Sequence, residues 1–137
     1  MNIKTPLLAA DCVIFKGNAP LLIKRKNEPF KDRYALPGGF VKIGETVEQA
    51  CKRELFEETS VRVSKLKLVG VYSSPKRDPR GHIVSIAFLA KPKSTRLKAG
   101  SDAGDAKFVK NWNKIKLAFD HKDMIKDALK IKFNNRN

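Results

Sequence analysis

Three glutamates, Glu54, Glu57 and Glu58, are spaced three and four residues apart and could together bind a divalent cation. On a helix of about 3.6 residues per turn they fall within about 60° of Glu54, on the side of apolar residues that should pack inward. Like charges at this spacing repel, and burial makes ionised carboxylates more costly. A hard cation would compensate, because it prefers clustered carboxylate oxygens. A solvent-exposed run of charge is the alternative interpretation.

The segment that carries these glutamates is predicted to be a helix over 47–59. Thr46 and Gln49 have the spacing of a capping box, and neither Gly nor Pro interrupts the segment. Residues 45–60 contain 5 acidic and 2 basic residues, whereas the whole chain carries a formal net charge of +15. The acidic window is therefore an anomaly in a basic protein, whose charge favours anionic partners in general.

The residues on both sides of this helix resemble the Nudix box, which would span residues 39–61. The box reads Gly, five residues, Glu, seven residues, then Arg-Glu-aliphatic-any-Glu-Glu-any-Gly-aliphatic. The chain has Gly39, Glu45 and the run RELFEETSV that begins at Arg53. Ser60 stands where the family has Gly, at a helix end that often adopts the left-handed conformation. Serine in that conformation should lower the stability of the fold by about 1 kcal/mol and should leave the positions of the carboxylates unchanged.

The resemblance implies an α/β fold, a Nudix-type α/β/α sandwich with a mixed sheet between helices, formed by a single domain over residues 1–137. It also implies hydrolysis of a nucleoside diphosphate linked to another group, by attack of water on the diphosphate. Mg²⁺ or Mn²⁺ is the implied cofactor. The implied metal ligands are Glu54, Glu57 and Glu58.

Further roles follow from the same resemblance. Glu57 or Glu58 could also act as the general base, while Arg53 would orient the carboxylates. Glu45 could ligate the metal or stabilise the neighbouring loop, and we favour the second role. Gly38–Gly39 would let the backbone approach a phosphate closely, since neither residue has a side chain.

The expected substrate is ADP-ribose, which would be cleaved to AMP and ribose 5-phosphate. Pro75 lies 15 positions after the box serine, a spacing that resembles the ADP-ribose pyrophosphatase group. Arg77 or Arg80 could bind a phosphate or ribose, or could form an ordinary basic loop. Asp102 and Asp105 could add carboxylates to the site, although acidic loop residues are more often turn formers.

Two other functions stay open. One is a Nudix hydrolase with a different substrate, namely an oxidised nucleoside triphosphate, a dinucleoside polyphosphate or a capped RNA end. The other is a non-catalytic sensor that binds ADP-ribose or nucleic acid. Nucleic acid is the weaker alternative as a partner, because the aromatic residues lie mostly in apolar strands rather than among basic residues. The resemblance also makes a homodimer possible.

The remaining sequence fits a cytoplasmic globular domain. The chain has 137 residues, 42% of them hydrophobic, and no apolar run approaches the roughly 20 residues of a membrane span. The apolar run at 7–10 is also too short for a signal peptide. Cys12 and Cys51 are far apart in sequence and lie in apolar runs, so we expect buried free thiols.

Apolar runs and alternation predict strands that mix with helices without a regular repeat, which favours a mixed sheet. A final helix, capped by Asp120, should extend to about Phe133. His82 and His121 have no catalytic partner at a readable spacing, so both are interpreted as structural. The predicted strands are 7–15, 21–24, 61–63, 66–72, 82–90 and 107–112.

Overall fold

A computed structural model of the chain describes residues 3–97 and 106–132. Helix α1 (Val47–Thr59) separates the first strands from the later ones, and helix α2 (His121–Lys130) follows the last strand. A short 3-10 helix, η1 (Trp112–Lys114), precedes α2. The strands are β1 (Leu7–Val13), β2 (Phe15–Lys16), β3 (Ala19–Lys24), β4 (Tyr34–Ala35), β5 (Gly38–Phe40), β6 (Val63–Tyr72), β7 (Ile83–Pro92) and β8 (Ala106–Phe108).

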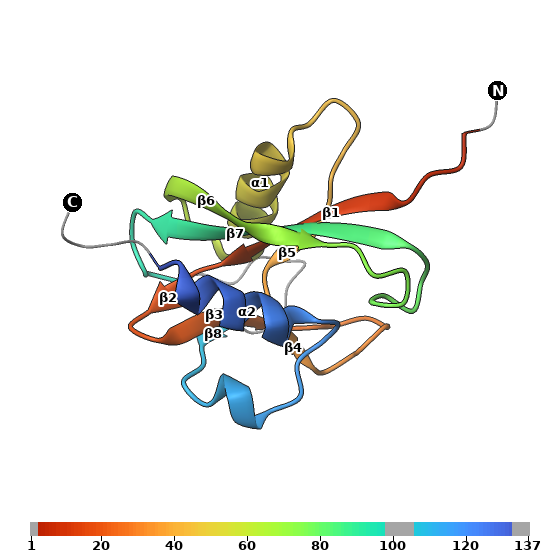
Figure 1. Cartoon of the computed structure of the whole chain (residues 1–137). Helices are drawn as coiled ribbons and strands as arrows, with labels where there is room; N and C mark the ends of the chain where they lie inside the picture. Colours follow the sequence, from red (N-terminus) through yellow and green to blue (C-terminus); the bar gives the residue numbers. More distant parts are fainter. Residues whose placement is uncertain (1–2, 98–105, 133–137) are drawn as a thin grey trace.

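A mixed sheet with the strand order β5-β1-β7-β6 forms the centre of the fold. Strands β1 and β7 run parallel, with Ala10 opposite Ile86, whereas β5 and β6 are antiparallel to their neighbours. Helix α1 covers one face of this sheet and α2 lies against the other (Figure 1). The result is the predicted mixed sheet between helices.

A second, smaller sheet is built around β3, which pairs antiparallel with β2, β4 and β8. It lies beside α2, on the side of the main sheet away from α1 (Figure 1). Gly17 turns the chain from β2 to β3 with a φ of +61°, which glycine adopts without steric cost. Because β3 ends at Lys24, Arg25 emerges beside the pocket described below.

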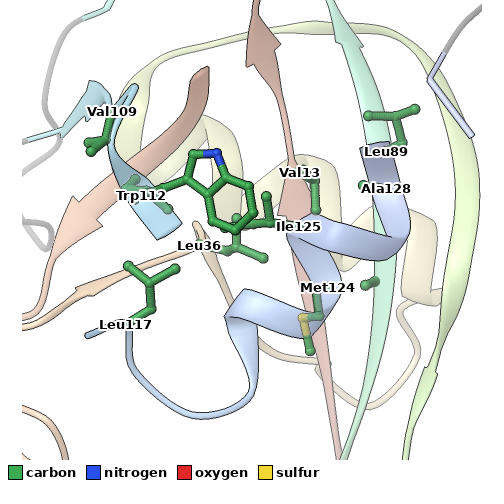
Figure 2. Close-up of a cluster of buried hydrophobic side chains, with 11 residues drawn as sticks. Val13, Leu36, Leu89, Val109, Trp112, Leu117, Met124, Ile125 and Ala128 are labelled. Carbon is green, nitrogen blue, oxygen red and sulfur yellow. The ribbon is translucent and has the colours of Figure 1, made fainter. Parts of the chain in front are cut away.

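Side chains of β1 alternate between the two faces of the main sheet and enter two hydrophobic clusters. Ala10 and Cys12 pack with Leu55 of α1 in the first cluster. Val13 belongs to the second, in which Trp112 and buried residues of α2 close the core (Figure 2). Burial of apolar surface, at roughly 25 cal/mol per Å², holds each helix on its own face of the sheet.

Helix α1 begins and ends as its sequence predicts. The Thr46 side chain accepts a hydrogen bond from the backbone of Gln49, whose side chain accepts one from the backbone of Thr46, which completes the capping box. Ser60 ends the helix in the left-handed conformation, with φ 64° and ψ 12°. The serine therefore keeps the backbone shape of the family glycine, at a cost of about 1 kcal/mol.

The expectation of free thiols was wrong, because Cys12 and Cys51 form a disulfide. Both side chains are fully buried, as expected. Their Cα atoms are 6.0 Å apart, since α1 packs directly on β1 at this point. This distance is within the range that a disulfide can bridge, but the sequence separation of 39 residues gives no sign of it.

Several predicted boundaries also differ. Val63–Tyr72 is one continuous strand rather than two, and an irregularity in its pairing with β7 between Val63 and Lys65 coincides with the polar interruption, while residues 61–62 lie outside the strand. The strand predicted over 107–112 ends at Phe108, and Trp112 instead begins η1. Helix α2 ends at Lys130, while Phe133 lies outside the described residues. Asp120 stands at the N-cap without a capping hydrogen bond.

Neither helix in the described ranges is long and apolar enough to cross a membrane.

Candidate active site

A pocket of about 400 Å³ lies where β1, β5 and α1 meet the 77–83 segment and the start of α2. Its volume is in the range of small-molecule sites. Its lining combines two carboxylates of α1 with arginines and aromatic rings. The residues that carry this contrast are Glu54, Glu58, Arg25, Arg77, Arg80, Phe40 and Phe119.

Glu58 is the most deeply placed glutamate of α1, with 8% of its surface exposed. Its Oε1 accepts a hydrogen bond of 2.9 Å from the backbone N–H of Gly38. Burial raises the pKa of Glu58 to about 8, against the lowering effect of Gly38, and the nearby charges of Glu54 and Asp11 add to the rise. The positive charge of Arg25, which also acts on Glu58, does not offset this rise.

Glu54 lies beside the second glycine of the loop. A Cβ added at Gly39 would overlap its carboxylate, so only glycine permits this close approach. Burial raises the pKa of Glu54, although Arg53 acts in the opposite direction through a 2.5 Å contact between its Nη1 and Oε1 of Glu54. Both pocket carboxylates thus contact β5, Glu58 through the Gly38 N–H and Glu54 through the space that Gly39 leaves.

Arg53 connects this helix to the loop that precedes it. Its Nε and Nη2 donate to the two carboxylate oxygens of Glu45 at 2.6 and 3.0 Å, and Nη2 also donates to the carbonyl of Phe40 at 3.1 Å. Glu45 accepts a further hydrogen bond from the backbone of Lys42. The Arg53 hydrogen bonds lower the pKa of Glu45 to about 2. Glu45 is therefore placed to hold the loop and Arg53.

Glu57 does not share the pocket with the other two glutamates. Its side chain is 46% exposed and lies 3.4 Å from Nη1 of Arg53. The helical wheel predicts all three carboxylates on one inward face, but the structure brings only Glu54 and Glu58 into the pocket lining, whereas Glu57 is exposed.

Arg77 and Arg80 have different environments. The Arg77 side chain is 4% exposed, and its Nε and Nη2 donate to the two carboxylate oxygens of Asp120 at 2.9 and 2.7 Å. The Arg80 side chain is 41% exposed and is held by buried Asp78 at 2.8 Å. Its guanidinium carbon lies 5.0 Å from the ring centroid of Phe40. Arg80 is the more available of the two for a substrate.

Two polar residues of the pocket were not predicted from the sequence as parts of the site. Asp11 and His121 both line it and are buried there, although His121 was interpreted as structural. Burial alone would raise the pKa of Asp11, but His121, the Ser85 hydroxyl and Arg77 together keep it below its ordinary value. Asp11 had one visible signal, since it is the only polar residue within the apolar run at 7–15.

Phe119 was also missed. Its backbone has φ of +51°, and its ring lies 5.1 Å from the guanidinium carbon of Arg25 and 5.6 Å from that of Arg80. The predicted accessory residues Asp102 and Asp105 lie outside the described residues.

The pocket contains ligand atoms that suit a hard divalent cation, because such a cation prefers carboxylate oxygens. Glu54 and Glu58 supply such oxygens, and the pKa values of both carboxyls are raised, chiefly by burial. Across residues 3–97 and 106–132, however, no group of three or more His, Cys, Asp or Glu side chains is already gathered around one ion position. Exposed Glu57 would have to turn inward to complete a three-carboxylate site.

The sequence pattern of the NUDIX domain matches residues 5–131, which is nearly the whole chain. The chain belongs to the Nudix family. It is 54% identical over 127 residues to an ADP-ribose pyrophosphatase from Methanocaldococcus jannaschii, a match that covers 93% of this chain and 75% of the relative.

Solved Nudix structures share the fold. The NUDIX domain of Shewanella oneidensis NrtR, complexed with ADP-ribose, is similar with a TM-score of 0.86 and 29% identity, over 94% of this chain and 90% of that one. A bifunctional NMN adenylyltransferase/ADP-ribose pyrophosphatase from Francisella tularensis, complexed with AMP and an Mn ion, has a TM-score of 0.81 and 30% identity. That match covers 96% of this chain but only 43% of the Francisella chain.

The Nudix box, residues 39–61, accordingly runs from β5 through the whole of α1. Its first glycine meets Glu54, its Glu45 meets Arg53, and its last aliphatic residue, Val61, is buried in the cluster under α1. The box is thus a structural unit in which the loop and the helix hold each other.

Proposed function

We propose that this Nudix protein hydrolyses ADP-ribose to AMP and ribose 5-phosphate, with Mg²⁺ or Mn²⁺ as cofactor. The observation that carries the proposal is the pocket, whose lining combines buried Glu58 and partly buried Glu54 of α1 with arginines and aromatic rings. This contrast suits a substrate with a charged diphosphate and a base or sugar. The archaeal relative that is 54% identical bears the name ADP-ribose pyrophosphatase, which supports the choice of substrate.

Glu54, Glu57 and Glu58 would hold the metal. When bound, the metal would neutralise charge on the diphosphate and favour ionisation of the attacking water. Glu57 or Glu58 would accept a proton from this water. Arg53 would act on the carboxylates rather than on the substrate, because its donors are directed to Glu54, Glu45 and the carbonyl of Phe40.

The substrate contacts follow from the available groups. The Gly38 N–H donates to Glu58, and side chains at Gly38 and Gly39 would overlap Asp11 and Glu54, so the two glycines would serve the substrate by making room for these carboxylates. Arg80 would bind the diphosphate or a ribose, since its side chain is half exposed beside Phe40. Arg77 would support the pocket through Asp120.

The test is a substrate panel on the purified protein with Mg²⁺ or Mn²⁺, comprising ADP-ribose, NADH, a diadenosine polyphosphate and 8-oxo-dGTP. We expect AMP release from ADP-ribose, with loss in Glu57→Gln and Glu58→Gln. Glu48→Gln is the matched control, because Glu48 lies on the exposed first turn of the same helix. Turnover of another compound in preference to ADP-ribose would replace the proposed substrate while keeping the Nudix chemistry.

A second candidate is a protein that binds ADP-ribose without cleaving it. The observation in its favour is the similarity to the NrtR domain that was solved in complex with ADP-ribose. Tight binding of ADP-ribose, together with no product in the presence of Mg²⁺ or Mn²⁺, would select this candidate.

We further propose a cytoplasmic location, because ADP-ribose is a small intracellular nucleotide. We also propose a homodimer, because large apolar side chains are exposed near the pocket. Leu7 is 58% exposed, and Phe40, which lines the pocket, is 39% exposed. A monomeric mass in light scattering would exclude the homodimer at the concentration measured.

A further inference from the structure

Asp11 is a buried carboxylate in the pocket wall for which the proposed chemistry has no role so far. Its residue surface is 6% exposed. One oxygen, Oδ2, accepts a hydrogen bond from the hydroxyl of Ser85 and lies 3.6 Å from Nε2 of His121. Asp11 and Ser85 are on adjacent strands of the main sheet, and His121 begins α2. Three distant parts of the chain therefore fix one carboxylate.

The His121 ring has a defined orientation toward this carboxylate. The backbone N–H of Leu36 donates to Nδ1 of His121 at 3.0 Å. Because Nδ1 acts as the acceptor, the neutral ring carries its proton on Nε2, the nitrogen that faces Asp11. The imidazole thus turns its N–H toward Asp11, and its own orientation is set by the backbone just before Gly38 and Gly39.

The other oxygen of Asp11, Oδ1, is left as an acceptor at the pocket wall. No hydrogen-bond donor reaches it from residues 3–97 or 106–132. It lies against Gly38, where an added Cβ would overlap it. The N–H of the same glycine donates to Glu58. The backbone of Gly38 therefore contacts both Oδ1 of Asp11 and the buried carboxyl of Glu58 on α1.

The chemistry of a carboxylate oxygen limits which groups can bind to Oδ1 of Asp11. It can only accept hydrogen bonds, and it repels the oxygens of a diphosphate. Its partner must therefore be a cation or a hydrogen-bond donor, such as water, a sugar hydroxyl or the amino group of a base. Water is favoured because Oδ1 adjoins Glu58, at the carboxylate end of the pocket.

We propose that Asp11 Oδ1 holds and orients the water that attacks the diphosphate, with His121 and Ser85 as positioning residues. The inference rests on the proposed hydrolysis. The water oxygen forms a bond to phosphorus as the bond to the bridging oxygen breaks, which yields AMP and ribose 5-phosphate. One proton of the water passes to Glu57 or Glu58, while the other keeps its hydrogen bond to Asp11. Asp11 thereby fixes the direction of attack.

Asp11→Asn is the direct test. Ser85 and His121 are donors, so they should retain the amide oxygen of the new side chain and leave its NH₂ at the position of Oδ1. An acceptor for water thus becomes a donor. We expect kcat for ADP-ribose to fall by about 100-fold, with KM changed by less than about threefold. Calorimetric titration should give an ADP-ribose Kd close to that of the wild type.

Two substitutions at His121 separate positioning from packing. Gln places an amide N–H near the position of Nε2 and keeps the donor to Asp11. Asn places an acceptor near the position of Nδ1 and keeps the Leu36 hydrogen bond instead. If His121 acts through Asp11, Gln should retain a kcat about tenfold higher than Asn. His82→Gln is the matched control, because His82 is exposed and outside this pocket.

The outcomes are distinguishable. Similar losses in both His121 variants, or a lower melting temperature with unchanged kcat, would overturn the proposal in favour of a structural role. A higher KM alone would indicate a sugar hydroxyl, and recovery of Asp11→Asn at high Mg²⁺ would indicate a metal ligand; both would also overturn it. A wild-type protein that binds ADP-ribose in the calorimeter but releases no AMP would instead refute the proposed function.

Discussion

Glu58→Gln should stabilise the metal-free protein at neutral pH, although it should abolish hydrolysis. Glutamine can keep the hydrogen bond from the Gly38 N–H, because it retains a side-chain oxygen. It removes the titratable carboxyl whose pKa is raised from 4.5 to about 8, mainly by burial. The variant should therefore have a larger free energy of unfolding than the wild type above pH 4.5, where the carboxyl of the unfolded wild-type chain ionises.

The sign follows from proton linkage. Between pH 4.5 and about 8 the folded wild type keeps the Glu58 proton while the unfolded chain loses it, so the free energy of unfolding falls as pH rises. The contribution from this group is fully present below pH 4.5 and is lost by about pH 8. At about 1.4 kcal/mol per pH unit, the loss at pH 7 is about 3 kcal/mol. For a domain of this size that corresponds to a melting temperature roughly 10 °C higher for the variant.

The assay is urea unfolding between pH 4 and 9 in the presence of a chelator, with wild type, Glu58→Gln and the exposed control Glu48→Gln. The Glu58→Gln protein should lack the downward slope of the other two and should converge with them near pH 4. Saturating Mg²⁺ should stabilise the wild type and leave the Glu58→Gln variant nearly unchanged. Parallel pH profiles for all three proteins would refute the conclusion that burial raises the pKa of Glu58.

Three further predictions concern the surroundings of the site. Reduction of the Cys12–Cys51 disulfide, which spans 39 residues, should lower the free energy of unfolding by about 4 kcal/mol in a chemical-denaturation assay, and an unchanged midpoint would contradict this. Ser60→Gly should raise stability by up to about 1 kcal/mol without changing kcat, since its left-handed backbone suits glycine; a destabilised variant would count against the strain. Glu45→Gln should lower kcat/KM for ADP-ribose by about tenfold by loosening Arg53, with Lys52→Gln as a surface control on α1, and equal activity would argue against that support.

The sequence predicted the parts of this protein that depend on local spacing. The capping box, helix α1 and its left-handed end all follow from residues a few positions apart, and the structure has each of them. The wheel also brought Glu54 and Glu58 to the correct side of α1. The wheel could not predict the exposure of Glu57. That exposure depends on contacts such as the one with Arg53, and not only on the position of Glu57 around the helix axis.

The parts that the sequence did not reveal depend on contacts between distant segments. Asp11 and His121 meet only because β1 lies in the main sheet and α2 packs across it. Arg77 was a candidate for substrate binding, but its guanidinium is taken by Asp120, which is 43 positions away. The disulfide has the same origin, since it requires α1 to be seated on β1.

The Cys12–Cys51 bond turns the first part of the chain into a covalent ring. Strands β2 to β5, with Gly38 and Gly39 in β5, and the first turn of α1 lie inside this ring, whereas Glu54, Glu57 and Glu58 lie just beyond it. The first part of the Nudix box, up to Cys51, thus lies within the disulfide-closed ring, and the rest of the box follows it in the chain. A protease cut in the exposed segment at 26–28 would leave both fragments attached. Such a nicked protein would migrate as two pieces only after reduction, and until then it would keep both walls of the pocket in one molecule.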